Sequence, residues 1–251
     1  SKNHLFGLLT KAEEIQSYLI YPSFDTAQFF VSLTGEPYQL SDFNACIDFL
    51  RDQNLLDSEK RCFLDIGANI GSTSIYAISS GSFTHSVSIE ASSLNYQFLL
   101  WNIAINGLQS QISPLNYGLA DFVGERTLIC SPYNCGDFRM SPETENPSDK
   151  YLYHEDQFKS EQVNFITLDE LVKRNAFDAS DIGFLWMDCQ GSEGFIFKGG
   201  ANFFSQVKIP IFVEFWPYGM NRLNCQADYF DFLSQYPVEI FTQIDHQMQK
   251  I

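Results

Sequence analysis

An acidic residue precedes a glycine-rich turn in the segment FLDIGANIGSTS, which spans residues 63–74. The apolar run contains Asp65, and glycines follow at Gly67 and Gly71. This GxxxG spacing differs from the GxGxxG of dinucleotide sites, and no lysine follows as in a P-loop. A carboxylate here would repel a phosphate, so the turn suits a ligand that has positive charge and no phosphate. S-adenosylmethionine is such a ligand, because it carries a sulfonium and an α-ammonium.

A second acid supports the same ligand. Glu90 ends the next apolar run, 19 residues after Gly71. In dinucleotide-binding folds an acid about 20 residues beyond the glycine turn binds the ribose hydroxyls. Taken singly, Asp65 could be a helix-capping acid and Glu90 a solvated strand end. The two together favour a cofactor site.

Short apolar runs alternate with helical patterns from Arg61 onward, which predicts right-handed crossovers and a mainly parallel sheet. The predicted strands are 61–66, 86–90, 112–120, 182–188, 209–215 and 238–244. The predicted helices are 71–80, 93–106, 167–175 and 221–235, of which the third begins with a capping box formed by Thr167 and Glu170. We therefore expect an α/β, Rossmann-like, doubly wound fold. Few residues follow 238–244, so we expect the sheet to be short or to lack its last strand.

Two segments lie outside this alternation. Residues 1–60 are predicted to be a helical extension that acts as a cap or lid, since apolar residues from Leu5 to Leu19 recur at helical spacing and a second helix begins near Ser41. Residues 121–166 are predicted to be an insert within the main domain, 61–251. In this insert GERTLIC and QVNFITL pair as antiparallel strands around a polar loop.

Composition narrows the possible partners. The chain has 31 acidic and 15 basic residues and a net charge of −16, which disfavours a nucleic-acid partner. It lacks an apolar run of about 18 residues, so we expect no membrane span. Its first residues lack a signal-peptide pattern, and its six cysteines are scattered without a CxxC pair. We expect a cytoplasmic protein with reduced thiols and no metal site. The oligomeric state is not assigned.

Several motifs occur together in the order seen in one family. DIGANIGSTS, IEASSLNYQFLLWNIAINGL, YGLADFVGERTL, NFITLDEL, GFLWMDCQGSEGFIFKGG and IPIFVEF resemble FkbM-type class I methyltransferases over about residues 61–216. The resemblance implies an O-methyltransferase that uses S-adenosylmethionine and modifies a hydroxyl of a sugar or another natural-product small molecule. Two positions depart from the family pattern: Ala91 replaces a proline, and Gln190 replaces an acid.

The resemblance also implies residue roles in cofactor binding. The turn would hold the methionine part, Glu90 would bind the ribose, and Asp121 could accept a hydrogen bond from the adenine amino group. The full set of expected cofactor residues is Asp65, Gly67, Ala68, Asn69, Gly71, Glu90, Ala91, Ser92, Asn95, Leu119, Ala120, Asp121 and Asp188.

Three acids are candidates for catalysis. Asp188, Glu193 and Glu214 follow or end two neighbouring predicted strands and could converge near the transferred methyl group. One of them, Asp188 or Glu193, could take the proton of the acceptor hydroxyl. The alternative explanation is that these acids cap adjacent helices.

Two other functions remain open from the sequence. The fold could serve a nicotinamide-dependent oxidoreductase, although the glycine spacing disfavours this. The chain could also be a catalytically inactive cofactor-binding relative, because Gln190 replaces an acid at the edge of the expected site.

Overall fold

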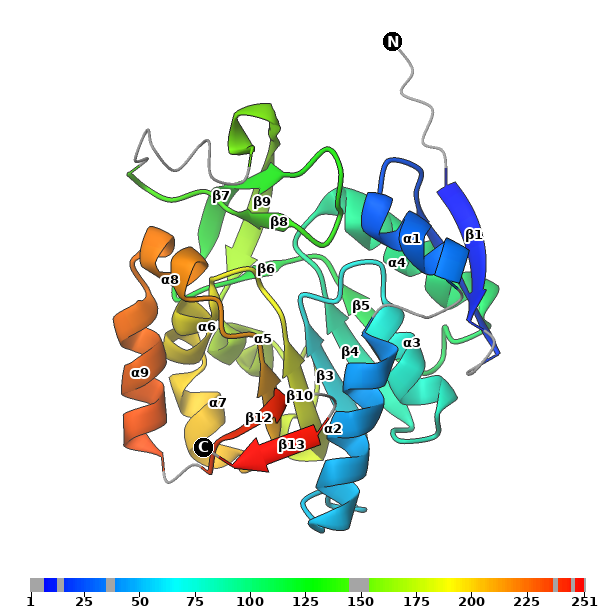
Figure 1. The fold of residues 1–251 in the computed structure, drawn as a ribbon. Coiled ribbons are helices and arrows are strands. Elements are labelled where there is room, and N and C mark those ends of the chain that lie inside the picture. Colours follow the sequence, from blue (N-terminus) through cyan, green and yellow to red (C-terminus); the bar gives the residue numbers. More distant parts are fainter. Residues whose placement is uncertain are drawn as a thin grey trace.

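A five-stranded parallel sheet forms the centre of the protein in the computed structural model (Figure 1), which describes residues 7–12, 16–34, 39–144, 154–236, 239–244 and 247–250. Its strands are β3 (Cys62–Ile66), β4 (His85–Ile89), β5 (Ile112–Leu115), β10 (Ile182–Met187) and β11 (Ile211–Val213). Their order is β11-β10-β3-β4-β5, and every pair is parallel. The chain runs outward from β3 in one direction and later returns to its other side. The carboxyl ends of β3, β4 and β10 therefore meet at a topological switch point, where ligands of such sheets bind.

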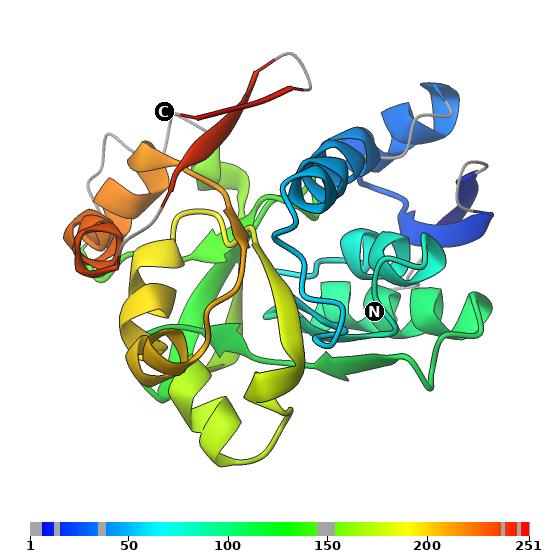
Figure 2. The ribbon, with the colours of Figure 1, turned by 90° about the horizontal axis from the view of Figure 1, so that it is seen from below.

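Both faces of this sheet are buried, which explains why β3 and β10 read as near-continuous apolar runs. Phe63, Phe184 and Trp186 pack against α2 (Leu40–Asp52), α3 (Ser72–Ser79) and α4 (Ser93–Ile105). Leu64 and Leu185 face the opposite side, where α6 (Glu193–Gly199) and α7 (Ala201–Gln206) pack. Figure 2 shows these two groups of helices on opposite faces of the sheet. The expected doubly wound α/β fold is confirmed.

A second, four-stranded sheet contains most of the predicted insert. Its strands are β6 (Gly118–Leu119), β9 (Lys159–Ile166), β7 (Gly124–Cys130) and β8 (Phe138–Met140), in that order. The expected antiparallel pairing of GERTLIC with QVNFITL is confirmed by β7 and β9. The expected single strand over 112–120 is wrong, because the chain leaves the central sheet after Leu115. At this point the side-chain amide of Asn116 donates to the backbone carbonyls of Glu90 and Ala91 at 2.9 and 3.1 Å, after the end of β4.

The expected helix at the start of the chain is also wrong. β1 (Gly7–Ala12) and β2 (Ser17–Pro22) form an antiparallel hairpin, followed by α1 (Thr26–Thr34) and α2. In β2 burial alternates, with Leu19 buried and Tyr18 exposed, so the apolar period is that of a strand. Asn102 of α4 fixes this strand by donating to the Ile20 carbonyl at 2.8 Å. The expected helix near Ser41 is confirmed as α2.

The C-terminal part differs from the expectation in two ways. The predicted helix 221–235 is two helices, α8 (Pro217–Leu223) and α9 (Gln226–Gln235), because Asn224 between them adopts a left-handed conformation with φ 59°. The predicted last strand is β12 (Phe241–Ile244), which pairs with β13 (Gln247–Lys250) outside the central sheet.

The capping box formed by Thr167 and Glu170 correctly predicted the start of α5 (Leu168–Lys173). Within the described ranges, no helix combines the length and hydropathy needed to cross a bilayer.

Candidate active site

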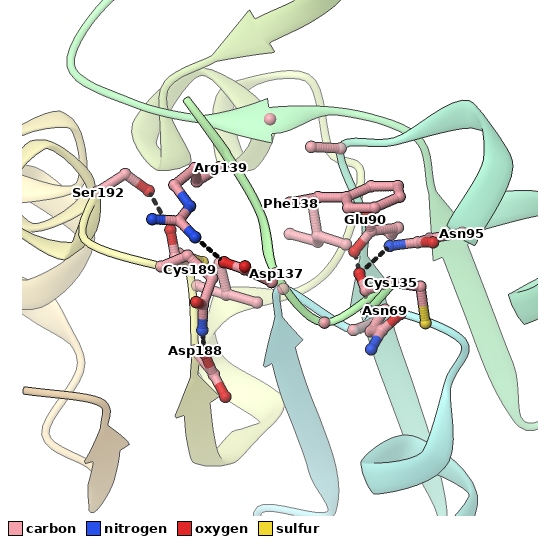
Figure 3. Close-up of a pocket in the computed structure, with 18 of the residues that line it drawn as sticks. Asn69, Glu90, Asn95, Cys135, Asp137, Phe138, Arg139, Asp188, Cys189 and Ser192 are labelled. Atoms are coloured by element: carbon pink, nitrogen blue, oxygen red, sulfur yellow. Dashed lines mark hydrogen bonds and ion pairs between the residues drawn. The ribbon is translucent and has the colours of Figure 1, made fainter. Parts of the chain in front are cut away.

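A cavity of about 410 Å³ opens at the switch point. Its walls come from the ends of β3, β4, β10 and β11, from residues 134–140, and from the N-terminal segment. Figure 3 shows Asp188, Cys189 and Arg139 on one side of this cavity and Glu90, Asn95 and Cys135 on the other. Of the residues expected from the sequence, the structure brings the following to the cavity wall: Gly67, Ala68, Asn69, Glu90, Ala91, Asn95, Leu119, Asp188 and Glu214.

The turn after β3 is held tightly between its neighbouring strands. The backbone N–H groups of Gly67 and Ala68 both donate to the carbonyl of Ile89, each at 3.0 Å. Gly67 has φ 83°, and a Cβ at this position would lie 2.0 Å from the backbone oxygen of Asp188. Only glycine therefore fits here, because the backbone needs a positive φ and β10 leaves no room for a side chain.

Glu90 is fixed at the cavity wall by backbone donors. Its Oε2 accepts the N–H of Asn69 and its Oε1 accepts the N–H of Ser92, both at 2.8 Å. Burial raises the pKa of Glu90 to about 7, against the opposing effect of these two hydrogen bonds. Because each carboxylate oxygen can accept more than one hydrogen bond, Glu90 can still bind the hydroxyls of a ligand.

Two carboxyl groups and two amides meet at the opposite wall. Asp188 accepts hydrogen bonds from Gln39 Nε2 at 3.0 Å and from Gln190 Nε2 at 2.8 Å. The same Gln190 nitrogen donates to Glu214 Oε2 at 3.2 Å. Burial, and then the negative charge of Asp188, raise the pKa of Glu214 to about 9. With a pKa of about 9, Glu214 holds its proton at neutral pH, and Gln190 joins it to the carboxyl group of Asp188.

Glu193 does not line the cavity, contrary to the expectation that it could act near the transferred methyl group. It is the first residue of α6 and is fully buried. Its Oε1 accepts the backbone N–H groups of Cys189 and Gly191 at 2.9 and 3.3 Å. Burial raises the pKa of Glu193 to about 7. Glu193 therefore has a structural role, because its carboxyl group caps the turn that precedes α6.

Replacing Glu193 by glutamine is expected to leave turnover unchanged, because the amide oxygen can accept the same two N–H groups. Because the pKa of Glu193 is about 7 in the folded protein and about 4.5 in the unfolded chain, ionisation of the unfolded chain lowers the free energy of unfolding as pH rises between these values. The stability advantage of Glu193→Gln over the wild type should therefore grow across that window, by at most about 1.4 kcal/mol per pH unit, and stay constant above it. Urea unfolding at several pH values measures this, with exposed Glu125→Gln as control. A large loss of turnover would contradict the assignment.

Asp65 also lies away from the cavity. Its side chain points to the face of the sheet that α3 covers, where Ser74 Oγ donates to its Oδ2 at 2.5 Å. Burial raises the pKa of Asp65 to about 7, against the opposing effect of Ser74. Asp65 therefore fixes α3 on β3, and the hypothesis that its carboxylate faces a positive ligand is not supported by its position.

Four further residues expected at the cofactor have other contacts. Asp121 pairs with Lys198 of α6 at 2.9 Å and is not among the residues that line the cavity. Ser92 caps α4 and donates to Glu161 at 3.0 Å. A Cβ on Gly71 would lie 2.5 Å from Leu99 Cδ1, which makes this glycine a packing residue. Ala120 is fully buried under α6, where its carbonyl lies against Gly199.

Several cavity residues were missed by the sequence reasoning. Gln28 and Gln39 come from the N-terminal segment, and nothing in their sequence context distinguishes them. Arg139 is 2% exposed, pairs with Asp137 and with Glu155, and lies 4.9 Å above the Trp216 ring. The sequence does distinguish Arg139 as a candidate site residue, because it is the one basic residue between 127 and 149.

The cavity fits a ligand rich in N–H and O–H donors. The side-chain oxygens of Gln28, Asn69 and Asn95 are buried and have no hydrogen-bond donor among the residues that the structure describes. Buried polar groups in native proteins are normally hydrogen-bonded, so these acceptors suit donors supplied by a ligand. Across the described part of the chain, no cluster of three or more His, Cys, Asp or Glu side chains could hold a metal ion.

Comparisons with known proteins agree with this fold. The Methyltransferase FkbM domain matches residues 65–241. No match is found among curated proteins. The crystal structure of methyltransferase FkbM from Methylobacillus flagellatus KT is 19% identical with a TM-score of 0.50, and the match covers 80% of this chain and 45% of that one. This chain thus spans less than half of that protein.

Two other solved structures are similar at lower scores. The M1A22 tRNA methyltransferase TrmK of B. subtilis is 9% identical, with a TM-score of 0.41 over 84% of this chain and 62% of that one. A putative caffeoyl-CoA O-methyltransferase from Staphylococcus aureus is 14% identical, with a TM-score of 0.42 over 89% and 88% of the two chains.

Proposed function

Because the chain belongs to the FkbM methyltransferase family, we propose that it transfers a methyl group to a hydroxyl of a sugar or another natural-product small molecule. The cofactor of this family is S-adenosylmethionine. The observation that carries the hydroxyl assignment is the pair of carboxyl groups, Asp188 and Glu214, at the cavity wall opposite Glu90. A hydroxyl acceptor needs a group that removes its proton, and this pair provides one.

The residues of the cavity divide into a cofactor side and an acceptor side. On the cofactor side, the turn from Gly67 to Asn69 would hold the methionine part and Glu90 the ribose hydroxyls. S-adenosylmethionine supplies the activated methyl group, because its sulfur becomes neutral on transfer. The protein mainly orients the acceptor oxygen, and correct orientation can contribute about 7–11 kcal/mol to lowering the barrier.

On the acceptor side, Asp188 would accept the hydroxyl proton at the carboxylate that Gln39 and Gln190 hold in place. Glu214 stays protonated at neutral pH and keeps a second negative charge away from Asp188. Gln39 belongs to the N-terminal extension that we propose as a cap, and its contact with Asp188 would cover this carboxylate.

Titration calorimetry of the purified chain tests this function. S-adenosylhomocysteine is expected to bind, whereas NAD and NADP are expected not to. Transfer of a tritiated methyl group from S-adenosylmethionine to monosaccharides and to phenolic natural products then tests the acceptor class. Binding of NAD in place of S-adenosylhomocysteine would indicate an oxidoreductase. Cofactor binding without transfer to any hydroxyl would indicate an inactive relative.

A further inference from the structure

Gln28 is a buried polar residue that the family match does not include. It lies on α1, outside residues 65–241, yet it lines the cavity and is only 4% exposed. Its Oε1 atom is buried without a hydrogen-bond donor from any described residue. A buried acceptor that lacks a donor is destabilising, so its retention at a cavity wall indicates a donor that arrives with a ligand.

The contacts around Gln28 connect α1 to the loop that contains Cys135. Asp25 Oδ1 accepts the N–H of Gln28 at 2.8 Å, and Asp25 Oδ2 accepts the N–H of Cys135 at 3.0 Å. The next residue along this loop, Gly136, is adjacent to the turn, because a Cβ built on it would lie 3.5 Å from Asn69 Nδ2. Asp25 therefore links the backbone of Gln28 to the loop whose next residue lies beside Asn69, and Gln28 and Asn69 line the same cavity.

The two side chains offer the same chemistry. The Oδ1 atom of Asn69 is, like Oε1 of Gln28, buried without a described donor. Neutral amide oxygens accept hydrogen bonds from a primary ammonium, which has three N–H donors. Unlike carboxylates, amides do not repel a carboxylate bound to the same carbon as that ammonium. An α-amino acid group therefore suits this part of the wall better than a simple amine would.

We infer that Gln28 binds the α-ammonium of the amino-acid end of S-adenosylmethionine and so makes the N-terminal segment part of the cofactor site. This inference rests on the proposed function, which places the methionine part along the turn that contains Asn69. It assigns a binding role to a residue outside the FkbM domain. Gln28 would distinguish cofactors that carry the amino-acid group from nucleosides that lack it.

Calorimetry with two ligands tests this role without an acceptor. S-adenosylhomocysteine carries the amino-acid end, whereas 5′-methylthioadenosine keeps the adenosine and sulfur but lacks that end. Gln28→Leu is expected to weaken S-adenosylhomocysteine binding about tenfold or more and to change 5′-methylthioadenosine binding by less than about twofold. Gln206→Leu, on an exposed residue at the end of α7, is the matched control and should change neither affinity.

A second variant covers the case in which Gln28→Leu does not fold. Gln28→Asn keeps a polar amide but shortens its reach, and it should show the same selective loss while its thermal unfolding stays close to that of the wild type. Equal loss for both ligands, or no loss for either, would overturn the inference and leave the proposed function standing. Failure of the wild type to bind either ligand would overturn the proposed function and the inference with it.

Discussion

Asp188→Asn is expected to lower kcat by about 10²–10⁴-fold, the usual contribution of a general base. The reason is the local chemistry of the cavity wall, where Glu214, with a pKa of about 9, already holds a proton at neutral pH, so we assign the proton transfer to its neighbour Asp188. Asparagine keeps the shape of the side chain but cannot take up a proton from a hydroxyl. Binding of S-adenosylhomocysteine should change little, because the turn and Glu90 are untouched. Steady-state methyl transfer and calorimetry on the same preparation separate the two effects.

Two further variants make this result specific. Glu214→Gln mimics the protonated carboxyl, so it should retain far more activity than Asp188→Asn at neutral pH. Asp231→Asn, on an exposed face of α9, controls for the loss of one negative charge. If Asp188→Asn kept wild-type turnover, neither the base nor the hydroxyl-acceptor assignment would survive.

The sequence predicted the central sheet because its strands are buried on both faces and end at chemically distinct residues. The runs ending at Ile66 and Met187 are nearly all apolar, whereas the run ending at Ile89 carries two buried serines, and all three lie between helical patterns. Strand ends at one edge of a parallel sheet must meet, so Glu90 and Asp188 could be placed at one cavity from the sequence alone. The first hairpin could not be recognised in this way, because its short strands carry apolar residues at spacings that also match a helix.

Asp65 and Glu193 show what strand position cannot reveal. Both lie close to turns at the carboxyl ends of strands, where a ligand was expected, as Asp188 does. Side chains alternate between the faces of a strand, and this alternation directs Asp65 to the α3 face instead of the cavity. Glu193 is directed inward by α6, an element that the sequence pattern did not predict. Long-range contacts such as Gln39 with Asp188, 149 positions apart, have no local signal at all.

Gln190 gives a physical reason for the departure from the family pattern at that position. Its single amide nitrogen donates to both Asp188 and Glu214, and its backbone is left-handed with φ 52°. A carboxylate there would add a third acid to a pair that already shares one site, and would offer no donor. The glutamine is therefore consistent with a carboxyl pair that is organised by amides.

Gly67→Ala is expected to destabilise the protein by about 2–5 kcal/mol, the sum of a left-handed alanine and a contact that forces the backbone to move. Gly67 has φ 83°, and its added Cβ would lie 2.0 Å from the backbone oxygen of Asp188. The clash is with a backbone atom, so no side-chain rotation can relieve it. Any shift that relieves it moves the cofactor turn away from β10, so S-adenosylhomocysteine affinity should fall as well.

Gly81→Ala separates the two causes, because Gly81 has φ 71° but nothing within 4 Å of the added Cβ. That control should lose only about 1–2 kcal/mol, the cost of the left-handed conformation. Urea unfolding of both variants, with calorimetry of S-adenosylhomocysteine, measures the difference. Equal destabilisation of the two would mean that the turn and β10 are not in close contact. The turn and the acceptor-side carboxylate of Asp188 would then not be held in one site by the close approach of Gly67 to the end of β10.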